Sequence, residues 1–171
     1  MKEPVLTDRL NLPDLAERAL AAAGRRHLTI VAAESCTAGK LSALLSEAPG
    51  AGEHLHGSFV TYTKANKVEA LGVDAELLDA KGAVCREVAV AMAQGALRRS
   101  PADVAVAVTG VAGPDPDEDG NPVGLVCIAA ARDGRNPLCV ERKYGDIGRE
   151  QVQEHAMADA LDQLIQCLEG G

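Results

Sequence analysis

The chain has 171 residues, of which 47% are hydrophobic and 25% are charged, a composition typical of a globular protein with one hydrophobic core. Its formal net charge of −8 argues against a nucleic-acid-binding face, and with no Trp and few other aromatic residues it offers no stacking platform for bases. No apolar run is long enough to span a membrane.

Five cysteines are widely scattered, and no pair has the Cys-x-x-Cys spacing. The four histidines form no His-Glu-x-x-His pattern, so the sequence predicts neither a disulfide framework nor a metal site. Because no signal peptide is recognisable, we expect a reduced, cytoplasmic protein.

Capping residues and apolar periodicity predict helices and strands that alternate along the chain after a flexible arm over residues 1–11. Helices are predicted at residues 13–24, 36–46, 64–71, 74–82, 86–99 and 149–168. Strands are predicted at residues 28–33, 57–63, 103–109, 123–131 and 138–144. This interleaving favours an α/β fold, with one layered domain over residues 12–171.

A polar cluster, Glu34-Ser35-Cys36-Thr37, joins the first predicted strand directly to an apolar helix. Unpaired backbone N–H groups at a helix N-terminus suit an anion or a developing oxyanion, so this junction is a candidate reaction site. Ser35 or Thr37 as a simple helix cap is the competing interpretation. Cys36 is an alternative nucleophile, because a thiol at a helix N-terminus has a lowered pKa.

A second apolar strand ends at Thr109-Gly110, and neighbouring strands would bring Ser35 and Thr109 into one crevice. The segment through Gly113 can equally be a plain loop, and the acidic residues 115–119 lack the ligand spacing of a calcium loop. Lys67 is either a solvated lysine or, if partly desolvated, a base toward a serine. Arg149 begins the last helix, where a phosphate could meet its guanidinium and the helix amides.

In the order of these segments, the sequence closely resembles the C-terminal domain of the CinA family, the nicotinamide-mononucleotide amidases. The resemblance covers about residues 12–168. It rests on Ala33-Glu-Ser-Cys-Thr-Ala-Gly39, Gly57-Ser-Phe-Val-Thr-Tyr-Thr-Lys-Ala-Asn-Lys67, Leu71-Gly-Val73, Gly82-Ala-Val84, Val108-Thr-Gly-Val-Ala-Gly-Pro114, Pro122-Val-Gly124 and Gly145-Asp146 with Arg149.

The resemblance implies a three-layer α/β/α sandwich with a mixed, mostly parallel sheet, in the stand-alone form of the amidase. It implies hydrolysis of nicotinamide mononucleotide to nicotinate mononucleotide and ammonia in pyridine-nucleotide salvage, without metal or cofactor. The expected partner is a small nucleotide substrate, with no nucleic acid or membrane. Exposed Ala-rich helices would suit a homodimer or higher homo-oligomer.

We therefore expect Ser35 to be the nucleophile and Lys67 its base, with Tyr62 and Glu34 supporting Lys67. The backbone N–H groups of Cys36 and Thr37 are expected to hold the oxyanion. The remaining substrate-binding positions are expected to be Gly39, Thr109, Gly110, Gly113 and Arg149, and Lys40 would add positive charge.

Three departures from the family pattern concern phosphate binding. Ala38 stands where the family usually has Gly, and Lys64 stands where it often has Asn. The third departure is at the last helix, where Ile147-Gly148 interrupts a Gly-Asp-Arg motif and Gln153 stands in place of a later Arg. These departures motivate a second hypothesis, an inactive nucleotide-binding or partner-binding module of the same fold. A hydrolase that uses the Cys36 thiol is a third.

Overall fold

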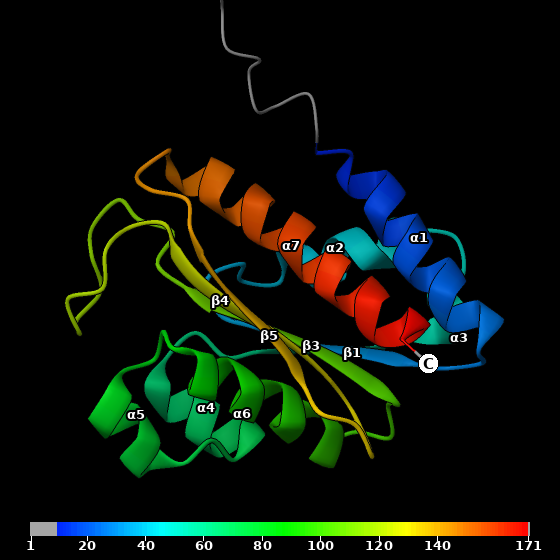
Figure 1. Cartoon of the computed structure of the whole chain (residues 1–171), viewed down its shortest axis with the longest axis horizontal. Helices are drawn as coiled ribbons and strands as arrows, with labels where there is room; N and C mark the ends of the chain where they lie inside the picture. The colour runs from blue at the N-terminus through cyan, green and yellow to red at the C-terminus, as the bar shows by residue number, and fades with distance from the viewer. Residues whose placement is uncertain (1–9, 171) are drawn as a thin grey trace, which may run out of the picture.

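The computed structural model describes residues 10–170 and shows a five-stranded sheet between two layers of helices (Figure 1). The predicted arm over residues 1–11 lies outside the described residues, apart from its last two. In chain order the elements are α1 (Leu12–Arg25), β1 (Ile30–Glu34), α2 (Lys40–Glu47), α3 (Ala51–His54), β2 (Leu55–Val60), α4 (Lys64–Leu71), α5 (Ala75–Lys81), α6 (Arg86–Arg98), β3 (Val104–Gly110), β4 (Leu125–Arg132), β5 (Leu138–Lys143) and α7 (Arg149–Glu169).

The sheet is mixed, with strand order β2-β1-β3-β4-β5. Strand β1 pairs in parallel with β2 and β3, whereas β4 pairs antiparallel with β3 and β5. Four strands therefore run in one direction and β4 runs against them. The predicted three-layer α/β/α fold with a mixed sheet is confirmed, although the pairs of neighbouring strands divide equally into parallel and antiparallel.

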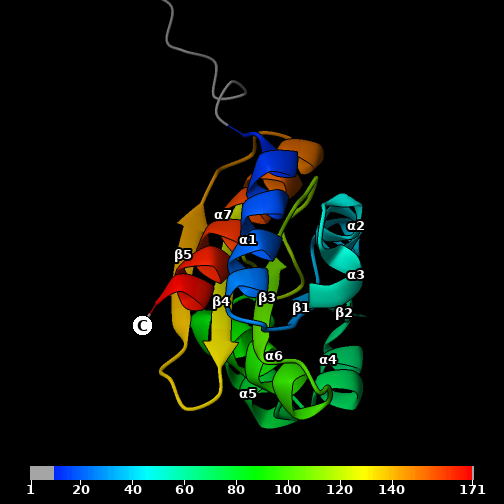
Figure 2. The same cartoon turned by 90° about the vertical axis from the view of Figure 1, so that its right-hand side faces the viewer.

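Helices α1, α2, α3 and α7 cover one face of the sheet, and α4, α5 and α6 cover the other (Figures 1 and 2). Alternate residues of each central strand serve the two faces, so Val104 and Val106 pack towards α7 while Ala105 and Ala107 pack towards α6. Every residue of β1 is buried, as expected for an inner strand covered on both faces.

The two connections that join the parallel strands run over opposite faces of the sheet, and this positions the site. The connection from β1 to β2 runs through α2 and α3 on one face, and the connection from β2 to β3 runs through α4, α5 and α6 on the other. Where the strand order reverses in this way, a crevice opens beyond the carboxyl ends of the two central strands. Here those strands are β1 and β3, which end next to Ser35 and at Gly110.

The helix predicted at residues 64–71 forms with those bounds because both of its ends are specified locally. The Thr63 side chain accepts a hydrogen bond from the Asn66 N–H, and Gly72 ends the helix at φ +68°. Asp74 caps α5 in the same way. Lys67 is thereby placed near the middle of a short helix that packs beside the sheet.

Three elements differ from the sequence-based predictions. The helix predicted from Cys36 begins only at Lys40, because Ala38 and Gly39 have φ of +50° and +94°, which are incompatible with a right-handed helix. The strand predicted to reach Thr63 ends at Val60, and the next residues turn into α4. The single-turn helix α3 was not predicted.

Candidate active site

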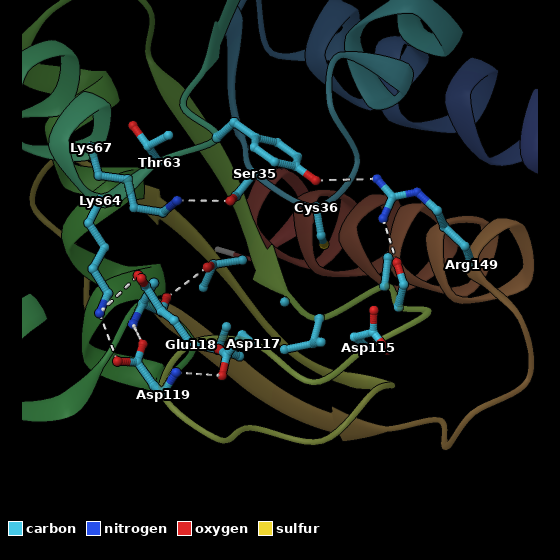
Figure 3. Close-up of a pocket in the computed structure, with 18 of the residues that line it drawn as sticks. Ser35, Cys36, Thr63, Lys64, Lys67, Asp115, Asp117, Glu118, Asp119 and Arg149 are labelled. Atoms are coloured by element: carbon cyan, nitrogen blue, oxygen red, sulfur yellow. Dashed lines mark hydrogen bonds and ion pairs between the residues drawn. The ribbon is translucent and has the colours of Figure 1, made fainter.

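Ser35 lies directly after β1, in the crevice between the ends of β1 and β3. Its backbone N–H donates to the Val108 carbonyl oxygen (3.0 Å), which fixes the residue against β3, and only 7% of it is exposed. Residues 36–39 then form a tight turn that leads into α2. The hydroxyl of Ser35 faces a pocket of about 530 Å³ at this edge of the sheet (Figure 3).

Lys67 reaches Ser35 from the opposite helical layer. Its Nζ lies 2.8 Å from the Ser35 Oγ (Figure 3). It also lies 2.8 Å from the carbonyl oxygen of Thr61, in the turn between β2 and α4. The lysine is 1% exposed. Thr61 was not singled out from the sequence, because its contribution is a backbone carbonyl, which has no residue-type signature.

Burial lowers the pKa of Lys67 to about 8, since desolvation disfavours the ammonium form. Within residues 10–170 no carboxylate pairs with Lys67, so nothing restores the charged form through an ion pair. A lysine with this pKa is present partly as the free amine near neutral pH. The amine can then accept the proton of the serine hydroxyl that it contacts.

Glu34 does not contact Lys67, which corrects the expected supporting role. Its fully buried carboxylate accepts four hydrogen bonds: Oε1 from Thr37 Oγ1 (2.7 Å) and Leu41 N (2.9 Å), Oε2 from Ser42 N (3.0 Å) and Ser58 Oγ (3.2 Å). Glu34 therefore caps the N-terminus of α2 and holds the turn that follows Ser35.

Among the residues that the structure describes, the turn after Ser35 leaves the backbone N–H groups of Cys36, Thr37 and Gly39 free. The Ala38 N–H donates to the Ser35 carbonyl oxygen (3.1 Å) and the Lys40 N–H to the Thr37 carbonyl oxygen (2.9 Å). In the described part of the chain, the N–H groups of Cys36 and Thr37 make no hydrogen bond. Both belong to this turn and not to the first turn of α2, but only Cys36 lines the pocket, whereas Thr37 is fully buried and does not line it.

Ala38 adopts a left-handed conformation, with φ +50°, at a position where the family usually has Gly. We expect Ala38→Gly to stabilise the fold by at most about 1 kcal/mol, because the relief of this strain is partly offset by the entropy of Gly in the unfolded chain. Urea unfolding of the wild type and the variant measures the difference. A destabilised variant would show that the Ala38 methyl group contributes packing that outweighs the strain.

Cys36 lines the pocket but is not suited to be its nucleophile. It is 5% exposed, and burial raises the pKa of its thiol to about 12, despite the opposing effect of Lys67. The expected lowering of this pKa by a helix N-terminus does not occur, because the helix begins four residues later. The thiol-hydrolase hypothesis loses its basis, since the thiolate is the reactive form.

Thr109, Gly110 and Gly113 also line the pocket, at the end of β3 and in the segment that follows it. The Thr109 hydroxyl donates to the Ala83 carbonyl oxygen (2.7 Å) and joins the end of β3 to the segment before α6. Gly39 does not line the pocket; with φ +94° it is the N-cap of α2 and contributes to the shape of the turn.

Arg149 and Tyr62 both line the pocket and contact each other there. Arg149 donates from one guanidinium nitrogen to the Gly113 carbonyl oxygen (2.8 Å), and another lies 3.4 Å from the Tyr62 hydroxyl. Tyr62 is 57% exposed and makes no hydrogen bond to Lys67, so the expected support of the lysine is not seen. Both side chains are instead placed to contact a bound ligand.

Gln153 takes part in the site in a way that the sequence did not indicate. It is buried on α7, where its amide nitrogen donates to the Cys36 carbonyl oxygen (2.8 Å) and its amide oxygen accepts from Lys40 Nζ (2.7 Å). The Lys40 side chain thus supports the turn after Ser35 from outside the pocket. Its expected contribution of charge inside the pocket is not seen.

Acidic side chains also face the pocket, from the connection between β3 and β4. Asp115, Asp117, Glu118 and Asp119 line it beside three cationic residues, Lys64, Lys67 and Arg149 (Figure 3). Over residues 10–170, no three His, Cys, Asp or Glu side chains gather in a geometry that could bind a metal ion. Nor does this part of the chain contain a helix both long and apolar enough to cross a membrane.

Comparison with known proteins supports the resemblance. A CinA-like protein of Mycobacterium sp. (strain JLS) is 48% identical over 144 residues, which are 84% of this chain and 34% of that protein. A CinA-like protein of Mycobacterium marinum is 43% identical over 162 residues, 94% of this chain and 36% of that protein. The chain thus spans about a third of the length of these relatives.

Solved structures match at close to full length. A competence/damage inducible protein from Agrobacterium tumefaciens has a TM-score of 0.87 and 42% identity, covering 92% of this chain and 94% of that one. A CinA superfamily protein from Escherichia coli has a TM-score of 0.87 and 33% identity, covering 97% and 94%. The model of the CinA C-terminal domain matches residues 13–168, and the chain therefore belongs to the CinA family.

Proposed function

We propose that this chain is an amidase that hydrolyses nicotinamide mononucleotide to nicotinate mononucleotide and ammonia, through an acyl-enzyme on Ser35. The observation that carries the proposal is the 2.8 Å contact between the Ser35 hydroxyl and the buried, unpaired Lys67. A serine next to a desolvated amine is an activated nucleophile of the kind used in acyl transfer. The substrate comes from the family resemblance, and the role of the reaction in pyridine-nucleotide salvage belongs to the same proposal.

In the proposed reaction, Ser35 Oγ attacks the carboxamide carbon while Lys67 Nζ takes the hydroxyl proton. The carbonyl oxygen becomes an oxyanion, which the free N–H group of Cys36 stabilises by roughly 3 kcal/mol, as a donor does in other oxyanion holes. Lys67 then gives its proton to the departing nitrogen, and ammonia leaves. Water attacks the remaining acyl-enzyme by the same steps and releases the carboxylate.

In this proposal the other residues that line the pocket bind the nucleotide substrate. The pocket volume of about 530 Å³ lies within the range of small-molecule sites. Arg149 offers a guanidinium that can meet the phosphate of a nucleotide, and Thr109, Gly110 and Gly113 also line the pocket. Tyr62 presents an exposed ring beside Arg149. In this proposal Glu34 acts only through the turn that it holds.

The direct test incubates the purified protein with nicotinamide mononucleotide and measures ammonia and nicotinate mononucleotide. We expect the two products in equal amounts. A folded protein that releases neither product contradicts the amidase proposal.

A second candidate is a nucleotide-binding module without turnover. It is motivated by the departures from the family pattern at Ala38, Lys64 and Gln153. Of these, Lys64 is paired with Asp119, and Gln153 is engaged with Lys40 and the Cys36 carbonyl oxygen. This alternative predicts that calorimetry detects binding of the nucleotide under conditions in which no ammonia appears.

The pH dependence follows from the lowered pKa of Lys67. Only the free amine accepts a proton, and with a pKa of about 8 roughly a tenth of the lysine is free at pH 7. We expect kcat/KM to rise about tenfold per pH unit below this pKa and to level off above it. Initial rates at constant ionic strength between pH 6 and 9.5 measure the profile, and a flat profile contradicts the assignment of Lys67 as the base.

A further inference from the structure

The connection between β3 and β4 contains an acidic loop, residues 115–122, that forms one wall of the pocket (Figure 3). Cations from two other elements hold this connection. Arg149, at the start of α7, binds the Gly113 carbonyl oxygen (2.8 Å) just before the loop. Lys64, at the start of α4, donates a hydrogen bond to Asp119 within the loop. The connection between β3 and β4 is therefore held by contacts with two other elements, α7 and α4.

Asp119 is the centre of the second attachment. Its Oδ1 accepts a hydrogen bond from Lys64 Nζ at 2.7 Å, and its Oδ2 accepts one from the Ala83 N–H at 3.3 Å. Lys64 Nζ also lies 3.3 Å from a carboxylate oxygen of Glu118. One carboxylate thus joins three segments that line the pocket: the start of α4, the segment before α6 and the acidic loop.

The packing beside Asp119 is close. A Cβ atom built on Gly82 would lie only 2.8 Å from Asp119 Oδ2, so the loop rests directly on the backbone before α6. Ala83 also accepts the hydroxyl hydrogen bond of Thr109. The position of Asp119 is therefore connected, through one residue, to the strand end that lines the pocket.

The loop itself is internally braced. Asp117 accepts hydrogen bonds from the Asp119 N–H (3.1 Å), the Asn121 N–H (2.7 Å) and the Asn121 side-chain amide (2.8 Å). Residues 117–121 can therefore move as one piece, and the contacts of Asp119 with other elements decide where that piece lies.

We propose that Lys64 and Asp119 form a clasp that positions the acidic loop as a wall of the pocket, and thereby sets the affinity for substrate rather than the rate of the chemical step. The proposal rests on the proposed amidase function. Lys64 and Asp119 are positioning residues, since they act through the loop and neither touches Ser35 or Lys67. Partly exposed ion pairs contribute little to overall stability, so loss of the clasp should alter the pocket and leave the fold intact.

The test uses Lys64→Met, Asp119→Asn and the double variant, with Lys64→Arg as the conservative control. We expect each single substitution to raise KM for nicotinamide mononucleotide about three- to tenfold, with kcat changed less than about twofold. The KM of the double variant should be no higher than that of the more impaired single variant, because all three variants lose the same Lys64–Asp119 contact. Lys64→Arg should restore most of the affinity.

A purely electrostatic effect has a different signature. Lys64→Met makes the pocket more negative by one charge and Asp119→Asn makes it less negative, so KM for a phosphate-bearing substrate would move in opposite directions. Asp115→Asn removes the same charge from the same loop without touching the clasp, and serves as the matched control. The proposal is overturned if KM shifts in opposite directions in Lys64→Met and Asp119→Asn. It is also overturned if Asp119→Asn and Asp115→Asn change KM equally.

A second measurement does not depend on turnover. Hydrogen exchange of the backbone amides at residues 117–121 should become faster in Lys64→Met and Asp119→Asn, and stay unchanged in Lys64→Arg. Unchanged exchange in both variants overturns the clasp even if the protein is an active amidase. Conversely, a wild type that releases no ammonia overturns the amidase proposal, and the exchange experiment still decides the clasp.

Discussion

Ser35→Ala should abolish the hydrolysis of nicotinamide mononucleotide, with kcat/KM falling by about 10³-fold or more. The substitution removes one oxygen atom from a residue that is held in place by its backbone bond to Val108, so the fold and the pocket should persist. Stopped-time ammonia assays measure the loss, and calorimetry should still detect substrate binding. Ser46→Ala, at an exposed serine of α2, is the matched control and should keep full activity.

Lys67→Met should cause a loss of similar size, because it removes the base and keeps most of the side-chain volume. The two effects should not add: the double variant Ser35→Ala/Lys67→Met is expected to resemble either single variant, since the two groups act as a unit. If Lys67→Met kept more than about a tenth of wild-type kcat/KM, the Ser–Lys assignment would be wrong. Lys143→Met, at an exposed lysine, controls for the loss of one positive charge.

Glu34→Ala should give the largest loss of stability among the variants considered. The buried carboxylate accepts four hydrogen bonds, two of them from the first amides of α2, and its removal leaves these donors without an acceptor. We expect a decrease of about 3 kcal/mol in the free energy of unfolding, which corresponds to roughly 6–12 °C in Tm for a domain of this size.

Urea and thermal unfolding measure this loss, with Glu47→Ala as the control at an exposed carboxylate on the same helix. Activity should fall as well, because the turn held by Glu34 carries the N–H group of Cys36. A Glu34→Ala variant as stable as Glu47→Ala would show that water replaces the lost acceptor without cost. In that case Glu34 does not hold the turn.

The sequence predicted the layered fold and most element positions because these depend on local signals. The helix at residues 64–71 has a capping threonine at one end and a glycine at the other, and both can be read from the chain. Two apolar strands that stop at small polar residues could also be read from the chain, but that β1 and β3 lie side by side was a condition of the predicted crevice and became known only from the structure. Contacts between side chains far apart in the sequence could not be predicted from such local signals.

Ser35 and Lys67 are 32 residues apart, and their pairing was expected only from the resemblance. It requires β2 to lie beside β1 and α4 to cover the opposite face from α2, which no local pattern specifies. The role of Glu34 was misassigned for a related reason. A carboxylate beside a helix start can hold a cation or cap the helix, and the choice depends on where the lysine lies in three dimensions.

The start of α2 was mispredicted because of Ala38, which occupies a position where the family usually has Gly. Alanine is the strongest helix former, so the pattern from Cys36 onward predicted a helix four residues too early. The buried Glu34 carboxylate and the contact of Gln153 with Cys36 hold the turn in which Ala38 and Gly39 are left-handed. These tertiary interactions outweigh a propensity difference of less than 1 kcal/mol per residue.

The burial of Lys67 also links folding to the proton concentration. In the unfolded chain this amine has its ordinary pKa of 10.5, whereas in the folded chain the pKa is about 8. Below pH 8 both states carry the proton, and the folded state bears the full cost of a desolvated charge. Between these two values the unfolded state binds more protons, so the free energy of unfolding rises with pH, by up to about 3 kcal/mol from this residue alone. The same desolvation that makes the lysine a base near neutral pH therefore makes the native state less stable under the conditions where it would work.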